Sequence, residues 1–185
     1  RLFAPGGAVG VQDKQIMTRF EAEVWNVVPG GGLQVFDTAL GKIGILICYD
    51  AEFPLLGHAL AACDVICVPS VTETLAGYWR VRIGAMARAL GNQCITAMAS
   101  CVGNADWSEA LGTSYGTGGI FAPPDTGFPE PGILALGQMN VPGWTFAEVN
   151  LDLIKTLRSD GTVINQADWP HQSGRDGPAP LIPLR

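Results

Sequence analysis

Charged residues are scarce in this 185-residue sequence, at 15%, and the 11 basic residues are outnumbered by 17 acidic ones. With a net charge of −6 and no basic cluster, the composition does not favour binding to nucleic acid. No apolar run approaches the ~20 residues that a membrane-spanning helix needs, so we expect no membrane insertion. The N-terminal segment lacks the apolar core of a signal peptide. Hydrophobic residues nevertheless make up 48% of the chain, which predicts a sizeable buried core.

The cysteines are few and odd in number, at positions 48, 63, 67, 94 and 101. A chain of this length and apolar content does not need a disulfide scaffold, which predicts a reducing, cytoplasmic location. Cys63 and Cys67 are separated by three residues, but no histidine or second cysteine pair stands at ligand spacing. We therefore predict that this pair is structural and that the chain binds no metal.

One cysteine has a notable position, because the apolar run Ile43–Ile47 ends at Cys48 and a helix pattern begins near Pro54. The run is short and rich in β-branched residues, which predicts a strand buried on both faces. The turn after such a strand lies at the sheet edge where open α/β folds bind ligands, and its free N–H groups could stabilise an oxyanion. The alternative is that Cys48 is a small apolar residue that ends a core strand.

The remaining pattern alternates strands with helices and then changes. Strands are predicted at 33–38, 43–47, 64–68 (ended by Pro69) and 94–100, with helices at 54–62 and 77–90, the second capped by Gly91–Asn92. This order predicts an α/β fold with a largely parallel sheet. Short strands at 119–122, 133–136 and 145–149 and a helix at 151–157 follow. We expect one domain over residues 1–185, ending in an extended, proline-rich arm at 170–185.

Histidine, the usual partner of a cysteine nucleophile, is present only as His58 and His171. His58 lies ten residues after Cys48 in the predicted helix, and His171 lies in the proline-rich tail. Neither position favours a Cys–His pair. A carboxylate that accepts the thiol proton and a lysine that stabilises an oxyanion would support cysteine chemistry in another way.

Five segments, in order along the chain, resemble the nitrilase, or carbon–nitrogen hydrolase, superfamily. Residues 44–54, GILICYDAEFP, resemble its nucleophile motif, and residues 13–21, DKQIMTRFE, resemble its catalytic-lysine segment. Residues 68–70, 80–89 and 118–123 resemble further landmarks of the family in the expected order. The resemblance covers residues 13 to about 170 and implies a four-layer α-β-β-α sandwich that works without a cofactor.

The resemblance also implies an activity and a set of roles. The family cleaves non-peptide carbon–nitrogen bonds of small amides or nitriles through a cysteine thioester, and its members pair into dimers or larger homo-oligomers. By the match, Cys48 is the nucleophile, Lys14 stabilises the oxyanion, and the Tyr49 backbone N–H is a second donor. Glu21 matches the family's second glutamate, with Glu23 as its competitor.

Three more residues are candidates for substrate contacts, because they follow strands at the same end of the sheet as Cys48: Glu52, Thr72 and Glu73. Each has a structural alternative. A carboxylate such as Glu52 in the first turn of a helix is also stabilised by the helix dipole alone.

The sequence departs from the family at its start. Family members carry a general-base glutamate well upstream of the lysine, whereas the thirteen residues before Lys14 contain only one carboxylate, Asp13. The first elements of the sandwich are also missing. We expect the chain to be the C-terminal portion of a longer one; a partner chain that completes it and a catalytically defective protein are the alternatives. The leading function is therefore a cysteine amidase, followed by a nitrilase and by a non-catalytic assembly module.

Overall fold

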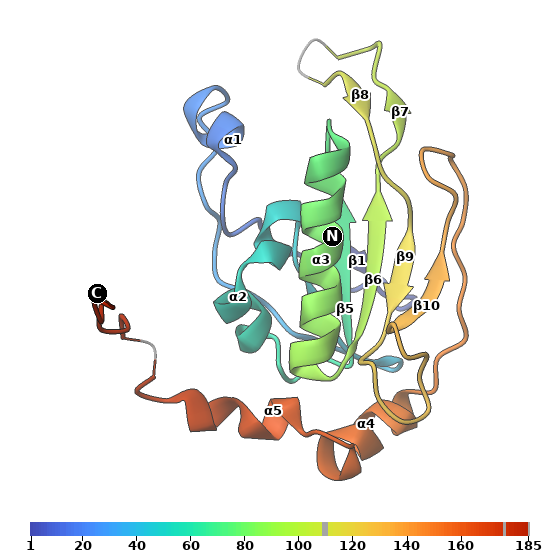
Figure 1. Cartoon of the computed structure of the whole chain (residues 1–185). Coiled ribbons are helices and arrows are strands. Elements are labelled where there is room, and N and C mark those ends of the chain that lie inside the picture. The colour runs from blue at the N-terminus through green and yellow to red at the C-terminus, as the bar shows by residue number, and fades with distance from the viewer. Residues whose placement is uncertain (109–110, 176, 185) are drawn as a thin grey trace.

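The computed structural model describes residues 1–108, 111–175 and 177–184. Its centre is a six-stranded mixed sheet in the order β10-β9-β6-β5-β4-β3 (Figure 1). The strands of this sheet are β3 (Phe36–Thr38), β4 (Gly41–Ile45), β5 (Val65–Ser70), β6 (Ile95–Ser100), β9 (Gly119–Phe121) and β10 (Ile133–Leu136). Strands β4, β5 and β6 run parallel, and the outer pairs β3–β4, β6–β9 and β9–β10 are antiparallel. The predicted α/β class and its parallel centre are confirmed.

Helices and short hairpins complete the chain. The helices are α1 (Arg19–Glu23), α2 (Pro54–Ala59), α3 (Leu75–Asn92), α4 (Leu151–Asp160) and α5 (Asn165–Asp168), with 3₁₀ turns η1 (Cys48–Glu52) and η2 (Trp169–Gln172). Two small hairpins pair β1 (Leu2–Phe3) with β2 (Val9–Gly10) and β7 (Gly103–Asn104) with β8 (Thr113–Ser114). No helix in the described part of the chain is both long enough and apolar enough to cross a membrane.

The core lies between the sheet and α3, which crosses in front of β5 and β6 in Figure 1. Buried residues of α3, such as Tyr78 and Val81, pack in one cluster with Leu46 and Ile66 of the central strands. Gly84 brings this helix against η1, since a Cβ there would lie 2.7 Å from the carbonyl oxygen of Ala51. The nucleophile turn is therefore fixed between a buried strand and a closely packed helix.

Strand β5 begins one residue later and ends two residues later than predicted, because Pro69 and Ser70 pair with β6 instead of ending the strand. Proline lacks the N–H that a ladder needs. The backbone groups of successive β5 residues point alternately toward β4 and toward β6. The carbonyl oxygen of Cys67 accepts the N–H of Leu46 on the β4 side, and the carbonyl oxygen of Ser70 accepts the N–H of Cys101 on the β6 side. Pro69 therefore faces the β4 side, where β4 has already ended, and no donor is required there.

The predicted strand at 145–149 is wrong. None of these residues is in a ladder, and the Phe146 side chain is 79% exposed. The alternating pattern is present, since residues 145, 147 and 149 are half-buried and residues 146 and 148 are exposed, but no strand pairs with the segment in the described structure. The strand predicted at 33–38 is also shorter, since β3 begins only at Phe36.

Helix α3 continues past the predicted Gly91–Asn92 cap and ends at Gln93, which has a left-handed φ of 44°. The Gln93 side chain is fully buried and joins the helix end to the C-terminal segment. Its Nε2 donates to the carbonyl oxygens of Leu157 and Val163, and its Oε1 accepts from the backbone N–H of Gln166. One side chain thereby holds α4 and α5 against the end of α3.

The C-terminal segment begins as predicted and then differs in detail. Helix α4 starts at Leu151 but reaches Asp160 rather than residue 157. Residues 170–172 form the end of η2, so the predicted arm at 170–185 does not start as an extended chain. Residues 173–175 and 177–184 are exposed without helix or strand, and residues 176 and 185 of the predicted arm lie outside the described part. The single domain over 1–185 stays a prediction.

Substitution of Gln93 by Leu tests the joint between α3 and the C-terminal segment. The change removes the three hydrogen bonds of a fully buried side chain, and although the Leu157 carbonyl keeps the N–H of Gly161, the Val163 carbonyl and the Gln166 N–H lose this partner. We expect the free energy of unfolding to fall by about 2–4 kcal/mol. Urea unfolding measures the change. Gln138→Leu, at an exposed position, is the control and should stay within about 0.5 kcal/mol of the parent. Equal stabilities of the two variants would contradict the role of Gln93.

Candidate active site

The thiol of Cys48 stands at the first residue of η1, three residues after β4 ends. Cys48 has a φ of 53°, in the left-handed region that a residue with a Cβ rarely adopts. Strain of this kind persists only where the surroundings enforce it, and it is concentrated at functional sites. The strand predicted at 43–47 is observed as Gly41–Ile45, so Cys48 follows the strand after a gap of two residues, and the backbone at Cys48 is strained.

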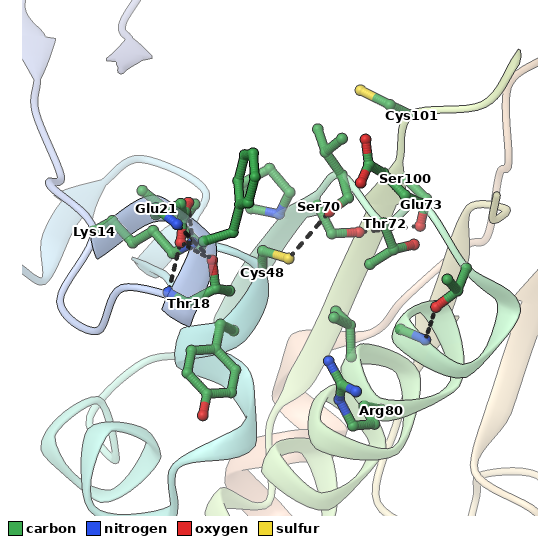
Figure 2. A pocket seen from close by; sticks show the side chains of 18 of the residues that line it. Lys14, Thr18, Glu21, Cys48, Ser70, Thr72, Glu73, Arg80, Ser100 and Cys101 are labelled. Atoms are coloured by element: carbon green, nitrogen blue, oxygen red, sulfur yellow. Dashed lines mark hydrogen bonds and ion pairs between the residues drawn. The ribbon is translucent and has the colours of Figure 1, made fainter. Parts of the chain in front are cut away.

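A pocket of about 700 Å³ opens beside this thiol (Figure 2). It lies between the α1 segment, η1, the end of β5 and the first turns of α3. All seven residues proposed from the sequence line it: Lys14, Glu21, Cys48, Tyr49, Glu52, Thr72 and Glu73. Positions far apart in sequence therefore line one pocket together with the Cys48 thiol.

Lys14 is held by Glu21 inside this pocket. The Lys14 Nζ lies 2.5 Å from both carboxylate oxygens of Glu21, and both side chains are mostly buried. Glu21 also accepts hydrogen bonds from the backbone and hydroxyl of Thr18, which caps α1. Burial acts to raise the pKa of Glu21, but these bonds lower it overall, so the carboxylate stays charged. Glu23 instead pairs with Arg19 on the exposed side of α1.

A buried carboxylate joins the Lys14 segment to the nucleophile turn. Asp50 is 1% exposed, and its oxygens accept the backbone N–H groups of Gln15, Ile16 and Ile47. Burial raises the pKa of Asp50, against the effect of these bonds. The sequence analysis did not select Asp50 and so missed this connection, which links positions 34 and 35 residues apart. An acidic residue directly after an apolar strand was the available signal.

Burial also raises the pKa of the Cys48 thiol. Backbone hydrogen bonds at Val71 and Tyr49 and the charge of Lys14 act in the opposite direction, while the charge of Glu21 adds to the increase. The nearby Lys14 ammonium favours the thiolate, but burial outweighs it. The thiol is thus protonated at neutral pH and must lose a proton to act as a nucleophile.

The candidates for substrate contact already have partners in the protein. The Thr72 hydroxyl donates to the carbonyl oxygen of Tyr115 at 2.8 Å, and Glu73 accepts the N–H of Gly112 at 3.1 Å. Glu52 pairs with Arg80 at 3.2 Å. These bonds fix the pocket wall, and Arg80, which the sequence interpretation did not select, adds a cation to it. Within the described residues, no group of three or more His, Cys, Asp or Glu side chains is placed to hold a metal ion.

Comparison with known proteins gives consistent matches. The family model described as carbon–nitrogen hydrolase matches residues 2–125. The chain is 38% identical over 164 residues to "Probable hydrolase YhcX" of Bacillus subtilis, covering 88% of this chain and 32% of that protein. It is 32% identical over 146 residues to "Deaminated glutathione amidase" of Dictyostelium discoideum, covering 75% of this chain and 46% of the relative.

A solved structure agrees with these sequence matches. Saccharomyces cerevisiae Nit3, described as a member of branch 10 of the nitrilase superfamily, superposes with a TM-score of 0.61 at 25% identity. The match covers 84% of this chain and 51% of Nit3. The fold is therefore of the nitrilase-superfamily type. The chain spans between about a third and a half of the length of the proteins that it matches.

Asp50→Asn tests the link between the two halves of the site. The amide keeps one acceptor but turns a donor toward backbone N–H groups, and charged hydrogen bonds of this kind contribute about 1.5–3 kcal/mol. We expect a loss of stability of that size in urea unfolding and faster tryptic cleavage after Lys14. Asp37→Asn, at an exposed position of β3, is the control. Equal unfolding free energies and equal cleavage rates of the two variants would show that Asp50 does not hold the two segments together.

The pH dependence of Cys48 alkylation tests its electrostatics. Because burial raises the thiol pKa, the midpoint of iodoacetamide labelling should lie above that of a free cysteine, ~8.5. Lys14→Met should move this midpoint up and Glu21→Gln should move it down, since the two charges act in opposite directions. Peptide mass spectrometry quantifies the labelling, with Arg19→Met as the exposed control. A midpoint below 8.5 would contradict this assignment.

Proposed function

Because this chain belongs to the carbon–nitrogen hydrolase family, we propose that the pocket around Cys48 hydrolyses the amide bond of a small molecule and releases ammonia or an amine. The observation that carries the proposal is the meeting of a strained Cys48 with the Lys14–Glu21 pair in one pocket. A relative named as an amidase supports the reaction class. The chain spans only part of its relatives, so the activity of the whole protein belongs to this proposal.

The reaction begins when the Cys48 thiol gives its proton to a base and its sulfur bonds to the amide carbon. The carbonyl oxygen becomes an oxyanion, which the Tyr49 backbone N–H and the Lys14 ammonium stabilise. The carbon–nitrogen bond breaks, the leaving nitrogen takes a proton, and a thioester remains on Cys48. Water then attacks the thioester, the carboxylic acid leaves, and the thiol regains its proton.

Glu21 orients the lysine in this mechanism. Its two oxygens hold the Lys14 Nζ, and its lowered pKa keeps it charged, so Lys14 has a fixed direction as well as a fixed charge. The general base is a separate requirement, because the raised pKa of Cys48 leaves the thiol protonated. General acid–base catalysis of such a step typically contributes ~10²–10⁴-fold. We assign that role to the upstream glutamate that the family resemblance implies.

The cellular location and the assembly of the protein are part of the same proposal. All five cysteines are free, and two of them, Cys63 and Cys94, have pKa values raised by burial to about 11 and about 12. Five free thiols, two of them buried and unreactive, fit a reducing cytoplasm. Exposed apolar side chains on α2 and α3, including Leu55, Trp79 and Ile83, support association into a homo-oligomer.

Steady release of ammonia from small primary amides tests the proposed function. Cys48→Ala should reduce turnover by at least ~10³-fold, because the covalent route is lost. Cys101→Ala is a matched control: this exposed thiol lines the same pocket but has no proposed role, so its activity should stay near the parent level. Intact mass spectrometry should detect an acyl group on the parent and on Cys101→Ala alone. Turnover of nitriles but not amides would assign a nitrilase, and equal turnover by Cys48→Ala would refute the nucleophile.

A further inference from the structure

A second cavity, of about 180 Å³, lies at the other end of α3 from the Cys48 pocket. Its wall combines Pro54 of α2, the last turns of α3, and Asn165, Trp169 and Gln172 of the C-terminal segment. Figure 1 shows this C-terminal segment passing the end of α3 on the side of α2. The two cavities share no lining residue, so this one is not an extension of the candidate active site.

Arg88 brings an unpaired cation to this cavity. Among the described residues, no carboxylate forms an ion pair with its guanidinium, and its Nη1 is buried without a hydrogen-bond partner. Burial lowers the pKa of Arg88, which reflects the loss of solvation around the charge. A partly buried cation without a counter-charge is unfavourable, and an anion in the adjacent cavity would remove that penalty.

Two more unpaired polar atoms belong to the same wall. The indole Nε1 of Trp169 and the Oδ1 of Asn165 are buried without partners in the described structure. His58 packs edge-on against the Trp169 ring, with the centroids 4.5 Å apart, and supports the ring. Three of the four unpaired buried side-chain atoms found in the described residues thus surround one small cavity: two donors and one acceptor.

We propose that this cavity binds a small carboxylate that carries a neighbouring hydrogen-bond donor, as a hydroxy acid or an amino acid does. The carboxylate would pair with the Arg88 guanidinium and the Trp169 N–H, and the donor would bind the Asn165 oxygen. The volume equals that of about six water molecules at ~30 Å³ each, which suits such a molecule. Since the three atoms are closed off from solvent, the Trp169 ring or the guanidinium turns toward the ligand on binding.

Thermal unfolding in sodium lactate, sodium propionate or sodium chloride at equal ionic strength tests the proposal. Lactate and propionate share a carbon skeleton, and only lactate has the hydroxyl donor. At about tenfold the Kd, lactate should raise Tm by about 3–6 °C, propionate less, and chloride not at all. Lactate should also change the tryptophan fluorescence of the parent but not of Trp169→Phe.

Variants at Arg88 and Gly91 identify the site. Arg88→Met removes the charge and should abolish the response to lactate. Gly91 lines the cavity three residues after Arg88, and a Cβ there would meet nothing within 4 Å. Gly91→Glu therefore supplies a carboxylate from the chain itself and should unfold at a higher temperature than the uncharged Gly91→Gln, with no response to lactate.

Four outcomes would overturn the inference. Equal lactate responses of the parent and Arg88→Met would refute the site, and equal Tm values of Gly91→Glu and Gly91→Gln would refute the need for an anion. Stabilisation by inorganic phosphate as large as that by lactate would refute the carboxylate class. Equal shifts with lactate and propionate would refute the neighbouring donor. If Arg88→Met does not fold, the Gly91 pair still decides the question.

Discussion

The candidate active site depends on the carboxylate of Asp50. Its oxygens accept N–H groups from Gln15 and Ile16 and from Ile47, so one side chain fixes the segment that carries the lysine and the turn that carries the thiol. Helix α1 contains no buried residue, and the other contacts that hold the segment are hydrogen bonds between residues 12–15 and residues 30–34. A carboxylate can satisfy several N–H groups at once, which suits it to this junction. The position of Lys14 is therefore set mainly by directed hydrogen bonds and less by packing.

The nucleophile turn also carries strain and desolvation. Cys48 adopts a left-handed φ, and its thiol is buried enough to raise its pKa. Close packing of Gly84 against the carbonyl of Ala51 limits relaxation of the turn. Because α3 packs closely against this turn, the backbone cannot return to an ordinary conformation without moving α3. Rigidity in the scaffold thus maintains an unfavourable geometry at the reactive residue.

The sequence predicted those features that depend on neighbours in the chain. The apolar run before Cys48 is such a local signal, and the parallel centre of the sheet follows from the order of elements. The roles of Lys14 and Glu21 came only from the family resemblance, because no pattern within residues 13–21 indicates a contact with Cys48. Asp50 and Gln93 were missed for a related reason: their partners lie 34 or more residues away, and a single sequence carries no record of such contacts. Residues 145–149 show the opposite error: their local alternating pattern predicted a strand, but no strand of the described structure pairs with them.

The Lys14–Glu21 pair limits what the lysine can do to the thiol. The two charges lie 2.5 Å apart, and their effects on the pKa of Cys48 oppose each other, so the pair resembles a dipole more than a free cation. A dipole acts at short range. Lys14 therefore has little effect on the pKa of Cys48. In the reaction that we propose, its ammonium acts most strongly on an oxyanion formed beside it, where an N–H can point directly at the charge, and the thiol proton leaves to a separate base.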